Sequence, residues 1–549
     1  MAGIIPALGA LRIGATAPWG WYPASVNDRA LASSGVPRPG TVARRPFIVD
    51  AARAYTERRI GKREFLRCMG LAGIGFSALG LAMLGGHRRG TGGFVDGAEA
   101  RGLTQPGGGL PDNQARWLRE VGGKFRGARI RYTTEATPPS IVLNRIKHEF
   151  TATTGIDVEI EIVPLEEVLA RATLDVDDQL GTYDLFYLDQ SWIANFVHHC
   201  VNPFELYRDR PDLAMPDFDW DDFDPPLVDG LAKVDGQWMG IPFDIPIFIL
   251  MYRRDLLEKH GIKVPTTYDE FSAAVRAIGE AEKANGVFGT GLQARSGHYS
   301  LECDWTQAIW GHGGSVFGKD RKFAGNDARA VEGLKWYQDL LTMSPPSSTE
   351  STWDGQFQMM VSGQVALVQS WSEHFPGLDA ADSKVQGLWE PARPLVPRLL
   401  RAAAECGFEE KPNAAHQGGS PIALSRYSRN PEAAWIFMQW ACCKEIVTRC
   451  TLAGGVAPTR HSSYNDPRVK ARATVGPGTT RHLEVVDWTI EHAIATEPHM
   501  PIWAELSSHD IPTELGKLLT GQAYGGDARR CLDAIATIVD ARVRDAGLR

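Results

Sequence analysis

From Arg129 onward, short strand-like runs alternate with longer segments in which hydrophobic residues recur at helical spacing. The predicted strands cover 129–133, 156–162 and 183–188. Between them, the segments 140–150 and 165–174 each place hydrophobic residues on one face of a helix. This order of strand, helix and strand predicts an α/β fold in which helices cover a parallel sheet.

Polar and aromatic residues follow two of these strands directly. Glu135, Asp189, Gln190 and Trp192 all lie just beyond the carboxyl ends of predicted strands. Because ligands of open α/β sheets bind beyond those ends, we predict that these four residues contact a ligand. Helix capping is the alternative for Glu135 and Asp189, and core packing is the alternative for Trp192.

The pattern changes after an acidic, aromatic loop at 216–222. This loop lacks the glycine and the glutamate of a calcium-binding loop, so we predict a solvated loop. An apolar run at 245–252 follows, and the helix that begins near Arg253 ends at Gly261. The next helix is predicted to be capped near Thr267.

Composition narrows the class of protein. The chain has 549 residues, of which 43% are hydrophobic and 23% charged, and its formal net charge is −8. These values are ordinary for a globular protein with two or three domains, and they argue against disordered, collagenous and multi-span membrane classes. The acidic balance also argues against a nucleic-acid partner, because phosphate binding needs an excess of basic residues.

The N-terminal hundred residues differ from the rest. Residues 1–60 are rich in Pro, Gly, Ala and Arg, which predicts a disordered extension or a mis-set start codon. In the segment 61–100, a basic stretch from Lys62 is followed by an apolar, glycine-rich run from Met69 to Gly86. This pattern resembles a twin-arginine export signal in which Lys62 replaces the first arginine. An uncleaved membrane anchor is the alternative, and either predicts that the chain from about residue 120 lies outside the cytoplasmic membrane.

Motifs for catalysis and metal binding are missing from the sequence. The eight cysteines form no C-x-x-C pair and no zinc-ligand spacing, which favours small buried side chains, with a Cys442–Cys450 bridge as the alternative. There is no H-E-x-x-H, G-x-S-x-G or P-loop motif. We therefore predict no catalytic residue, metal site or cofactor, although a carboxylate pair that hydrolyses a glycoside stays open.

Several segments together resemble one family. They include Gly240-Ile241-Pro242, the helix with Tyr252 and Asp255-Leu256-Leu257, and the Gly261-Ile262-x-x-Pro265-x-Thr267 link. Others continue the resemblance downstream: 357–371, 418–424, 430–435, 454–460 and 498–503. In this order the segments resemble the extracellular solute-binding proteins of ABC importers, the family that includes maltose-binding protein. The resemblance covers roughly residues 125 to 545.

The resemblance implies a type II periplasmic binding protein fold, whose two α/β lobes are joined by crossing strands and close on a ligand in the cleft between them. One lobe would comprise 125–243 plus 424–485, and the other 249–415 plus 486–549. The expected function is the capture of a carbohydrate or polyol for an ABC permease, without chemistry. The expected protein is a monomer in the periplasm or on the outer face of the cytoplasmic membrane.

Sugars and polyols need aromatic platforms and hydrogen-bonding side chains. The resemblance places Trp371 at the family's cleft tryptophan, and Glu373 follows two residues later as an acceptor for hydroxyl groups. Asp244 lies at the first predicted crossing, and Gly419 and Ser420 lie at the return crossing.

Further tryptophans are weaker candidates for stacking. Trp503 follows a proline-rich turn and is a second possible platform, while Trp305 and Trp310 belong to a helix for which core packing is the alternative. Trp435 and Trp440 are predicted to pack in the core. Arg460 is predicted to fix its turn through a surface or interface pair.

Two other functions stay open. The first is an exported polysaccharide-active enzyme or scaffold on an α/β framework. The second is the same binding fold with another ligand, such as a peptide, a polyamine or an inorganic anion.

Overall fold

The structure, a computed structural model, describes residues 109–318, 322–396 and 415–548. All of them belong to one compact unit that runs from Phe76 to Arg549. The predicted extension and the predicted export signal lie outside the described residues. Within the described ranges, no helix is both long enough and apolar enough to cross a membrane.

The first sheet has five strands in the order β2-β1-β3-β11-β6. Its strands are β1 (Arg129–Glu135), β2 (Asp157–Val163), β3 (Leu185–Tyr187), β6 (Ile241–Asp244) and β11 (Ser420–Leu424). The strands β2, β1 and β3 are parallel, as predicted, whereas β11 runs antiparallel to both of its neighbours. The register pairs Tyr132 with both Ile160 and Leu185, so apolar residues of three strands meet in the core.

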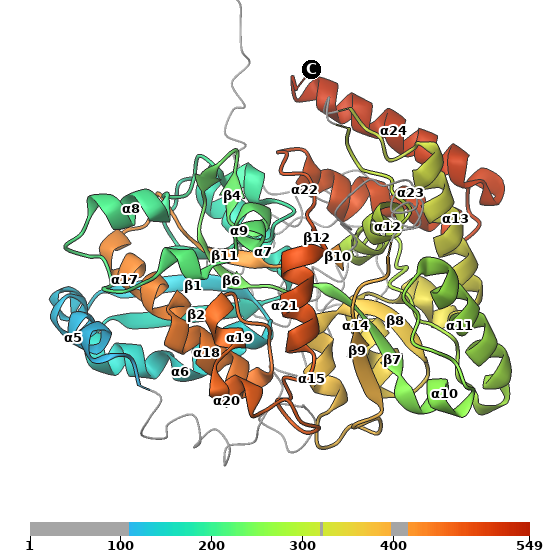
Figure 1. The fold of residues 1–549 in the computed structure, drawn as a ribbon. Coiled ribbons are helices and arrows are strands. Elements are labelled where there is room, and N and C mark those ends of the chain that lie inside the picture. Colours follow the sequence, from blue (N-terminus) through green and yellow to red (C-terminus); the bar gives the residue numbers. More distant parts are fainter. Residues whose placement is uncertain (1–108, 319–321, 397–414, 549) are drawn as a thin grey trace, which may run out of the picture. The chain divides into compact units, whose positions relative to one another are not determined.

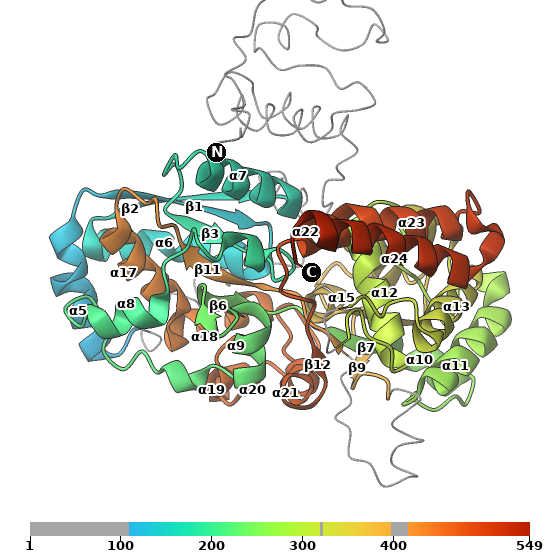
Figure 2. The same cartoon turned by 90° about the horizontal axis from the view of Figure 1, so that it is seen from above.

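Helices cover both faces of this sheet. The connecting helices are α6 (Pro138–Thr154) and α7 (Leu165–Asp177), and α17 (Pro431–Cys442) and α18 (Lys444–Gly454) follow β11. Proline in the first turn starts α6, and Gly155 ends it in the left-handed conformation. Both α7 and α17 contact β1, and they lie on opposite sides of the sheet (Figure 2).

The second sheet has three antiparallel strands around β7 (Phe248–Arg253), with β8 (Leu367–Trp371) and β9 (Trp389–Ala392) at its edges. The helix α10 (Arg254–Lys259) contacts β7, and α14 (Trp353–Val361) contacts β8 (Figure 1). The next helix, α11 (Tyr268–Ala281), begins with a capping box between Thr267 and Glu270, which confirms the predicted cap.

The remaining elements complete the described chain. The helices are α5 (Asp112–Glu120), α8 (Pro203–Asp209), α9 (Pro225–Leu231), α12 (Tyr299–Gly311), α13 (Ala328–Thr342), α15 (Phe375–Leu378), α19 (His461–Tyr464), α20 (Pro467–Lys470), α21 (Leu483–His492), α22 (Trp503–Glu505), α23 (Ile511–Leu519) and α24 (Ala528–Asp545). The short strands are β4 (Lys233–Val234), β5 (Gln237–Trp238), β10 (Ala415–His416) and β12 (Ile494–Ala495).

Three chain segments pass between the two sheets. Residues 245–247 join β6 to β7, residues 417–419 join β10 to β11, and β12 pairs in parallel with β10. The amide of Gly418 donates to the carbonyl of Pro246 at 2.9 Å, and the amide of Gln417 donates to that of Ala495 at 2.9 Å. The crossing segments therefore lie side by side as a hydrogen-bonded set.

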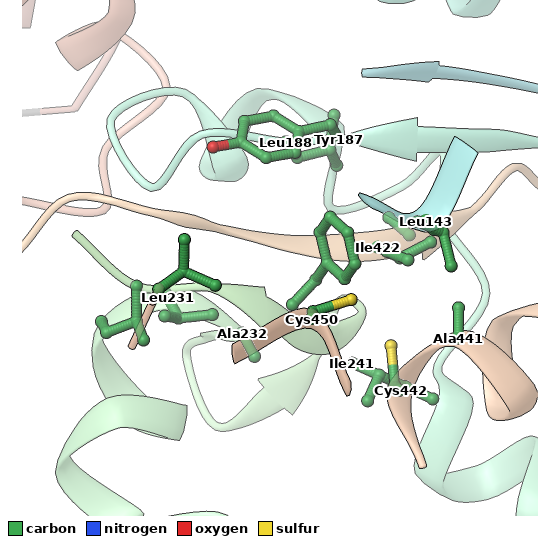
Figure 3. Close-up of a cluster of buried hydrophobic side chains, with 14 of the residues drawn as sticks. Leu143, Tyr187, Leu188, Leu231, Ala232, Ile241, Ile422, Ala441, Cys442 and Cys450 are labelled. Carbon is green, nitrogen blue, oxygen red and sulfur yellow. The ribbon is translucent and has the colours of Figure 1, made fainter. Parts of the chain in front are cut away.

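Two hydrophobic cores hold the elements. The first surrounds the five-stranded sheet and continues past the crossing segments to Trp371 and Trp389, while the second lies among α11, α12, α13, α23 and α24. Part of the first core is drawn in Figure 3, where Leu188, Ile422 and Cys450 gather near β11. As predicted, Trp435 and Trp440 are buried in this core.

The described cysteines are all buried and unbonded: Cys200, Cys303, Cys442, Cys443, Cys450 and Cys531. The alternative of a Cys442–Cys450 bridge is therefore not realised. These side chains pack as small apolar groups, which is the interpretation that the sequence favoured.

Arg460 corrects one prediction. Its side chain is fully buried instead of pairing at the surface, and its guanidinium lies 3.9 Å from the ring centre of Phe223 and 4.5 Å from that of Phe218. The guanidinium also donates to the carbonyl of Cys442 at 3.0 Å. The acidic loop is thus not simply solvated, because its Phe218 is buried against this arginine.

Candidate functional site

The candidate site begins at the ends of strands in the first sheet. Glu135 is the last residue of β1, and Asp189 and Gln190 follow β3. Asp244 is the last residue of β6 and pairs with Ser420, the first residue of β11. The fold therefore brings these five predicted residues to the edge where the crossing segments leave the sheet.

Hydrogen bonds fix this edge. The hydroxyl of Tyr187 donates to Asp244 Oδ2 at 3.0 Å, and the amide of Gln190 donates to the carbonyl of Gly419 at 3.1 Å. Gly419 has φ +105°, and a Cβ there would lie 2.3 Å from the carbonyl oxygen of Asp244. Only glycine fits this position, because any side chain would force the return crossing away from β6.

Trp371 belongs to the second sheet, where it ends β8 opposite Phe248. The two rings meet edge to face, with centroids 4.3 Å apart, and the indole Nε1 donates to Gln293 Oε1 at 3.3 Å. A Cβ on Gly418 would lie 2.9 Å from the indole ring, so the return crossing packs directly against Trp371. Glu373 lies two residues further on and is half-buried.

Four acidic residues, here called the carboxylate cluster, influence one another at this junction: Glu135, Asp189, Asp244 and Glu373. Burial raises the pKa of Glu373 to about 8, with a smaller contribution from the charge of Asp244. Burial also raises the pKa of Asp189 to about 7 and that of Asp244 to about 6. The pKa of Glu135 is well above its ordinary value because of burial and then the charge of Glu373.

These shifts have a chemical consequence. Carboxyl groups that keep protons near neutral pH offer both hydrogen-bond donors and acceptors, whereas ionised carboxylates only accept. Glu373 follows a strand of the second sheet and raises the pKa of Glu135, which ends a strand of the first. Asp244, also from the first sheet, raises the pKa of Glu373, so groups from both sheets face one another. The cluster suits a ligand whose groups both donate and accept.

Local sequence patterns did not mark Tyr299, the first residue of α12. Its hydroxyl accepts from Gln190 Nε2 at 3.1 Å, donates to Glu497 Oε1 at 3.0 Å and lies 3.4 Å from Asp189 Oδ1. Next to it, His298 Nε2 lies 3.2 Å from Glu166 Oε1. These contacts connect α12 to residues around the first sheet, and no signal short of the tertiary structure identifies them.

Three predicted tryptophans lie elsewhere. Trp192 is buried in the first core, and Trp305 and Trp503 are buried in the second. The indole of Trp503 donates to Glu497 Oε2 at 2.6 Å, which satisfies its only polar group. Their packing matches the alternative of a core role. Trp310 is half-buried and stacks on His416, with ring centroids 5.4 Å apart.

Comparison with protein families gives one match that covers more than half of the chain. The family described as bacterial extracellular solute-binding protein matches residues 134–442. This range includes most strands of both sheets and all members of the carboxylate cluster.

Individual proteins give matches of similar extent. The chain is 24% identical over 463 residues to the erythritol/L-threitol-binding protein of Mycolicibacterium smegmatis, which covers 78% of this chain and 87% of that protein. It is 22% identical over 367 residues to a probable amino-acid ABC transporter periplasmic-binding protein of Sinorhizobium fredii, covering 66% and 79%. Among solved structures, a ribitol complex of an ABC transporter solute-binding protein from Agrobacterium radiobacter superposes with a TM-score of 0.65 at 24% identity, covering 75% and 98%.

Proposed function

The chain belongs to the bacterial extracellular solute-binding proteins, and we propose that it captures a carbohydrate or a polyol and delivers it to an ABC importer. It has the two-lobed type II periplasmic binding protein fold that the sequence predicted. Members of this family bind solutes for transporters instead of transforming them. The observation that carries the proposal is the convergence of strand ends from both sheets, with Trp371 beside them, at the crossing segments.

The chemistry of the junction supports a polyhydroxyl ligand. A sugar or polyol presents hydroxyl groups that donate and accept, and the partly protonated carboxylate cluster does the same. Trp371 supplies an apolar surface for the C–H face of the ligand. Two relatives are named as polyol-binding proteins, one for erythritol or L-threitol and one for mannitol.

The proposed mechanism is conformational. We place one lobe at 125–243 plus 424–485 and the other at 249–415 plus 486–549, so that each contains one of the two larger sheets. A ligand that contacts both lobes stabilises their closed arrangement, and the permease recognises that arrangement. The contacts of Tyr299 with Gln190 and of His298 with Glu166 are the ones that would form on closure.

The location follows from the family, which acts outside the cytoplasm. We propose export by the twin-arginine route, which the basic and apolar pattern at 61–86 supports, and a monomeric mature protein. Replacing Lys62 and Arg63 by glutamine should leave the precursor in the cytoplasm. Export of that variant at the normal rate would contradict the route without touching the binding function.

A thermal-shift screen tests the ligand class. The panel contains four- to six-carbon polyols, monosaccharides, disaccharides and amino acids, each confirmed by calorimetry. A polyol or sugar should raise the unfolding temperature, and a concentration of 100 Kd would add about 2.7 kcal/mol of stability. Stabilisation by amino acids alone would overturn the ligand class, and cleavage of a glycan during the assay would favour the enzyme alternative.

A further inference from the structure

A second group of reactive side chains surrounds His416, which also contacts Trp371. This buried cluster consists of Glu302, Cys303, His416 and Glu497. The first two belong to α12, His416 ends β10, and Glu497 follows β12. Their exposed fractions are 0%, 0%, 0% and 3%. The residues are far apart in the sequence, which is why no spacing motif predicts them as a set.

Three of the side chains bring atoms that can bind a metal close together. One atom each from Cys303, His416 and Glu497 lies within 4.8 Å of the other two. His416 Nε2 is 3.3 Å from Glu497 Oε1. A thiolate, an imidazole and a carboxylate at this separation need only small side-chain movements to share one ion, because zinc ligands lie about 2.0–2.3 Å from the metal.

The hydrogen bonds around His416 decide which ring nitrogen faces the cluster. The hydroxyl of Thr306 lies 2.9 Å from His416 Nδ1 and donates its single proton to the carbonyl of Cys303 at 3.0 Å. With its proton on that carbonyl, the hydroxyl accepts from Nδ1–H, which is one of the two tautomers that this contact allows. In the neutral ring this leaves the lone pair of Nε2 aimed at the carboxylate of Glu497, which is repulsive unless a cation or a proton lies between them.

Glu302 adds a second carboxyl group to the buried cluster. Neither of its carboxylate oxygens has a hydrogen-bond donor among the described residues, although the side chain is fully buried. Within the described part of the chain, no Lys or Arg forms an ion pair with Glu302 or Glu497. Glu497 has the imidazole of His416 as its charged partner when that ring is protonated, whereas no described Lys, Arg or His forms an ion pair with Glu302, and burial of charge requires a positive partner.

We propose that Cys303, His416 and Glu497 bind a zinc ion. One sulfur, one nitrogen and carboxylate oxygens form a donor set that suits tetrahedral zinc. Two of the ligands have outer partners that orient them: Thr306 contacts His416, while Tyr299 and Trp503 donate to separate oxygens of Glu497. A divalent ion bound by these ligands would neutralise the negative charge of the Glu497 carboxylate.

The site would fix the crossing segments to the second lobe. His416 and Glu497 come from two adjacent crossing segments, and Glu302 and Cys303 come from α12. His416 also contacts Trp371 edge to face, with ring centroids 5.4 Å apart. Zinc would therefore order the hinge directly beside the proposed ligand platform. This inference stands on the buried cluster alone and does not depend on which solute the protein binds.

The experiment uses the full chain after treatment with a chelator. Zinc affinity is measured by competition with a chromophoric chelator, and cobalt is used as a spectroscopic substitute. Wild-type protein should bind one ion per chain, and cobalt should give a thiolate charge-transfer band in the near ultraviolet. The substitution Cys303→Ser should abolish that band and weaken zinc binding by at least about 100-fold. The matched control Cys200→Ser, which changes a buried cysteine outside the cluster, should leave both unchanged.

X-ray absorption on the wild-type zinc complex gives a second measurement that needs no variant. It should show one sulfur at about 2.3 Å and nitrogen or oxygen ligands at about 2.0–2.1 Å. Absence of zinc binding by the wild-type protein would overturn the proposal and leave protons as the occupants of the cluster. Zinc binding without sulfur ligation, or unchanged binding in Cys303→Ser, would overturn it equally. Failure of the sugar and polyol screen would not affect these results.

Discussion

The carboxylate cluster and the buried cluster contain similar chemical groups in different surroundings. The carboxylate cluster is built from strand ends of both sheets, and Glu135 and Glu373 are only half-buried. The buried cluster comes from one helix and two crossing segments, and solvent hardly reaches it. Access therefore separates their roles: the first can exchange hydrogen bonds with an entering solute, whereas the second can hold only an ion or protons.

The two clusters are neighbours, and two side chains connect them. The hydroxyl of Tyr299 lies within 3.4 Å of both Asp189 and Glu497, and Trp371 contacts His416. Substitutions at the return crossing, at the two connecting residues and within the carboxylate cluster show whether the clusters act separately or as one unit.

Gly419→Ala should damage both clusters, because residues 417–419 join His416 to Ser420. The added Cβ meets the carbonyl of Asp244 in a left-handed backbone conformation. The free energy of unfolding should fall by about 3 kcal/mol. Gly521→Ala is the matched control, since it has φ +72° and open space around its Cβ, and it should cost about 1 kcal/mol. Equal losses of unfolding free energy for Gly419→Ala and Gly521→Ala, measured in urea, would show that the backbone near Asp244 moves to accommodate the added Cβ.

Trp371→Ala should affect the solute more than the ion. Loss of the platform should weaken binding of the stabilising sugar or polyol by about 1–3 kcal/mol in calorimetry, a loss typical of a binding hot spot. Zinc affinity should stay within a few-fold of wild type. Trp305→Phe, in the second core, serves as the control that alters packing alone. Unchanged solute affinity in Trp371→Ala would move this residue to the core.

Tyr299→Phe should weaken binding of both the solute and the zinc ion. It removes the hydroxyl that bonds Gln190 and Glu497, so solute binding should weaken by about 1 kcal/mol. Tyr337→Phe removes a buried hydroxyl that donates to Asp304 and bonds neither Gln190 nor Glu497, so it should lower stability without changing solute affinity. A solute effect as large in Tyr337→Phe as in Tyr299→Phe would contradict a specific connection.

Glu373→Gln should change the dependence of stability on pH. The folded-state pKa of about 8 lies above the ordinary value, so between about pH 4 and 8 the folded protein holds more protons than the unfolded chain. This contribution to stability is complete at low pH and is lost as the pH rises through 8. The ligand-free protein should therefore lose less stability between pH 5 and 8 in the variant than in wild type. Glu484→Gln, at an exposed position on α21, should keep the wild-type slope.

Sequence patterns predicted the local elements of the first lobe well. The alternating run at 156–162 became β2 at Asp157–Val163, and the helix predicted at 140–150 became α6 at Pro138–Thr154. Helix capping at Thr267 was confirmed to the residue. These features follow from side-chain periodicity and backbone preference, which act over a few residues.

The candidate site was predicted only in part. Strand ends predicted Glu135 and Asp189, and the family resemblance predicted Asp244 at the first crossing. The structure brings these three residues to one edge of the sheet, and their contact with a ligand stays a prediction. Tyr299 and Gln293 had no such signal, since helix and loop positions become neighbours of the crossing segments only after the lobes pack. Arg460 was misplaced at the surface because an arginine in a turn is usually exposed, and only the fold supplied the phenylalanine rings that cover it.

The sequence alone determined the α/β class, the order of elements and the residues at the carboxyl ends of strands, because periodicity and composition act locally along the chain. Among the described residues, tertiary structure placed Trp371 in the first core beside the crossing segments and buried Trp305 and Trp503 in the second core. It also assembled the buried cluster from residues in three separate parts of the chain. The physical reason is that contact and burial depend on how distant segments pack, and no spacing within one segment records that packing.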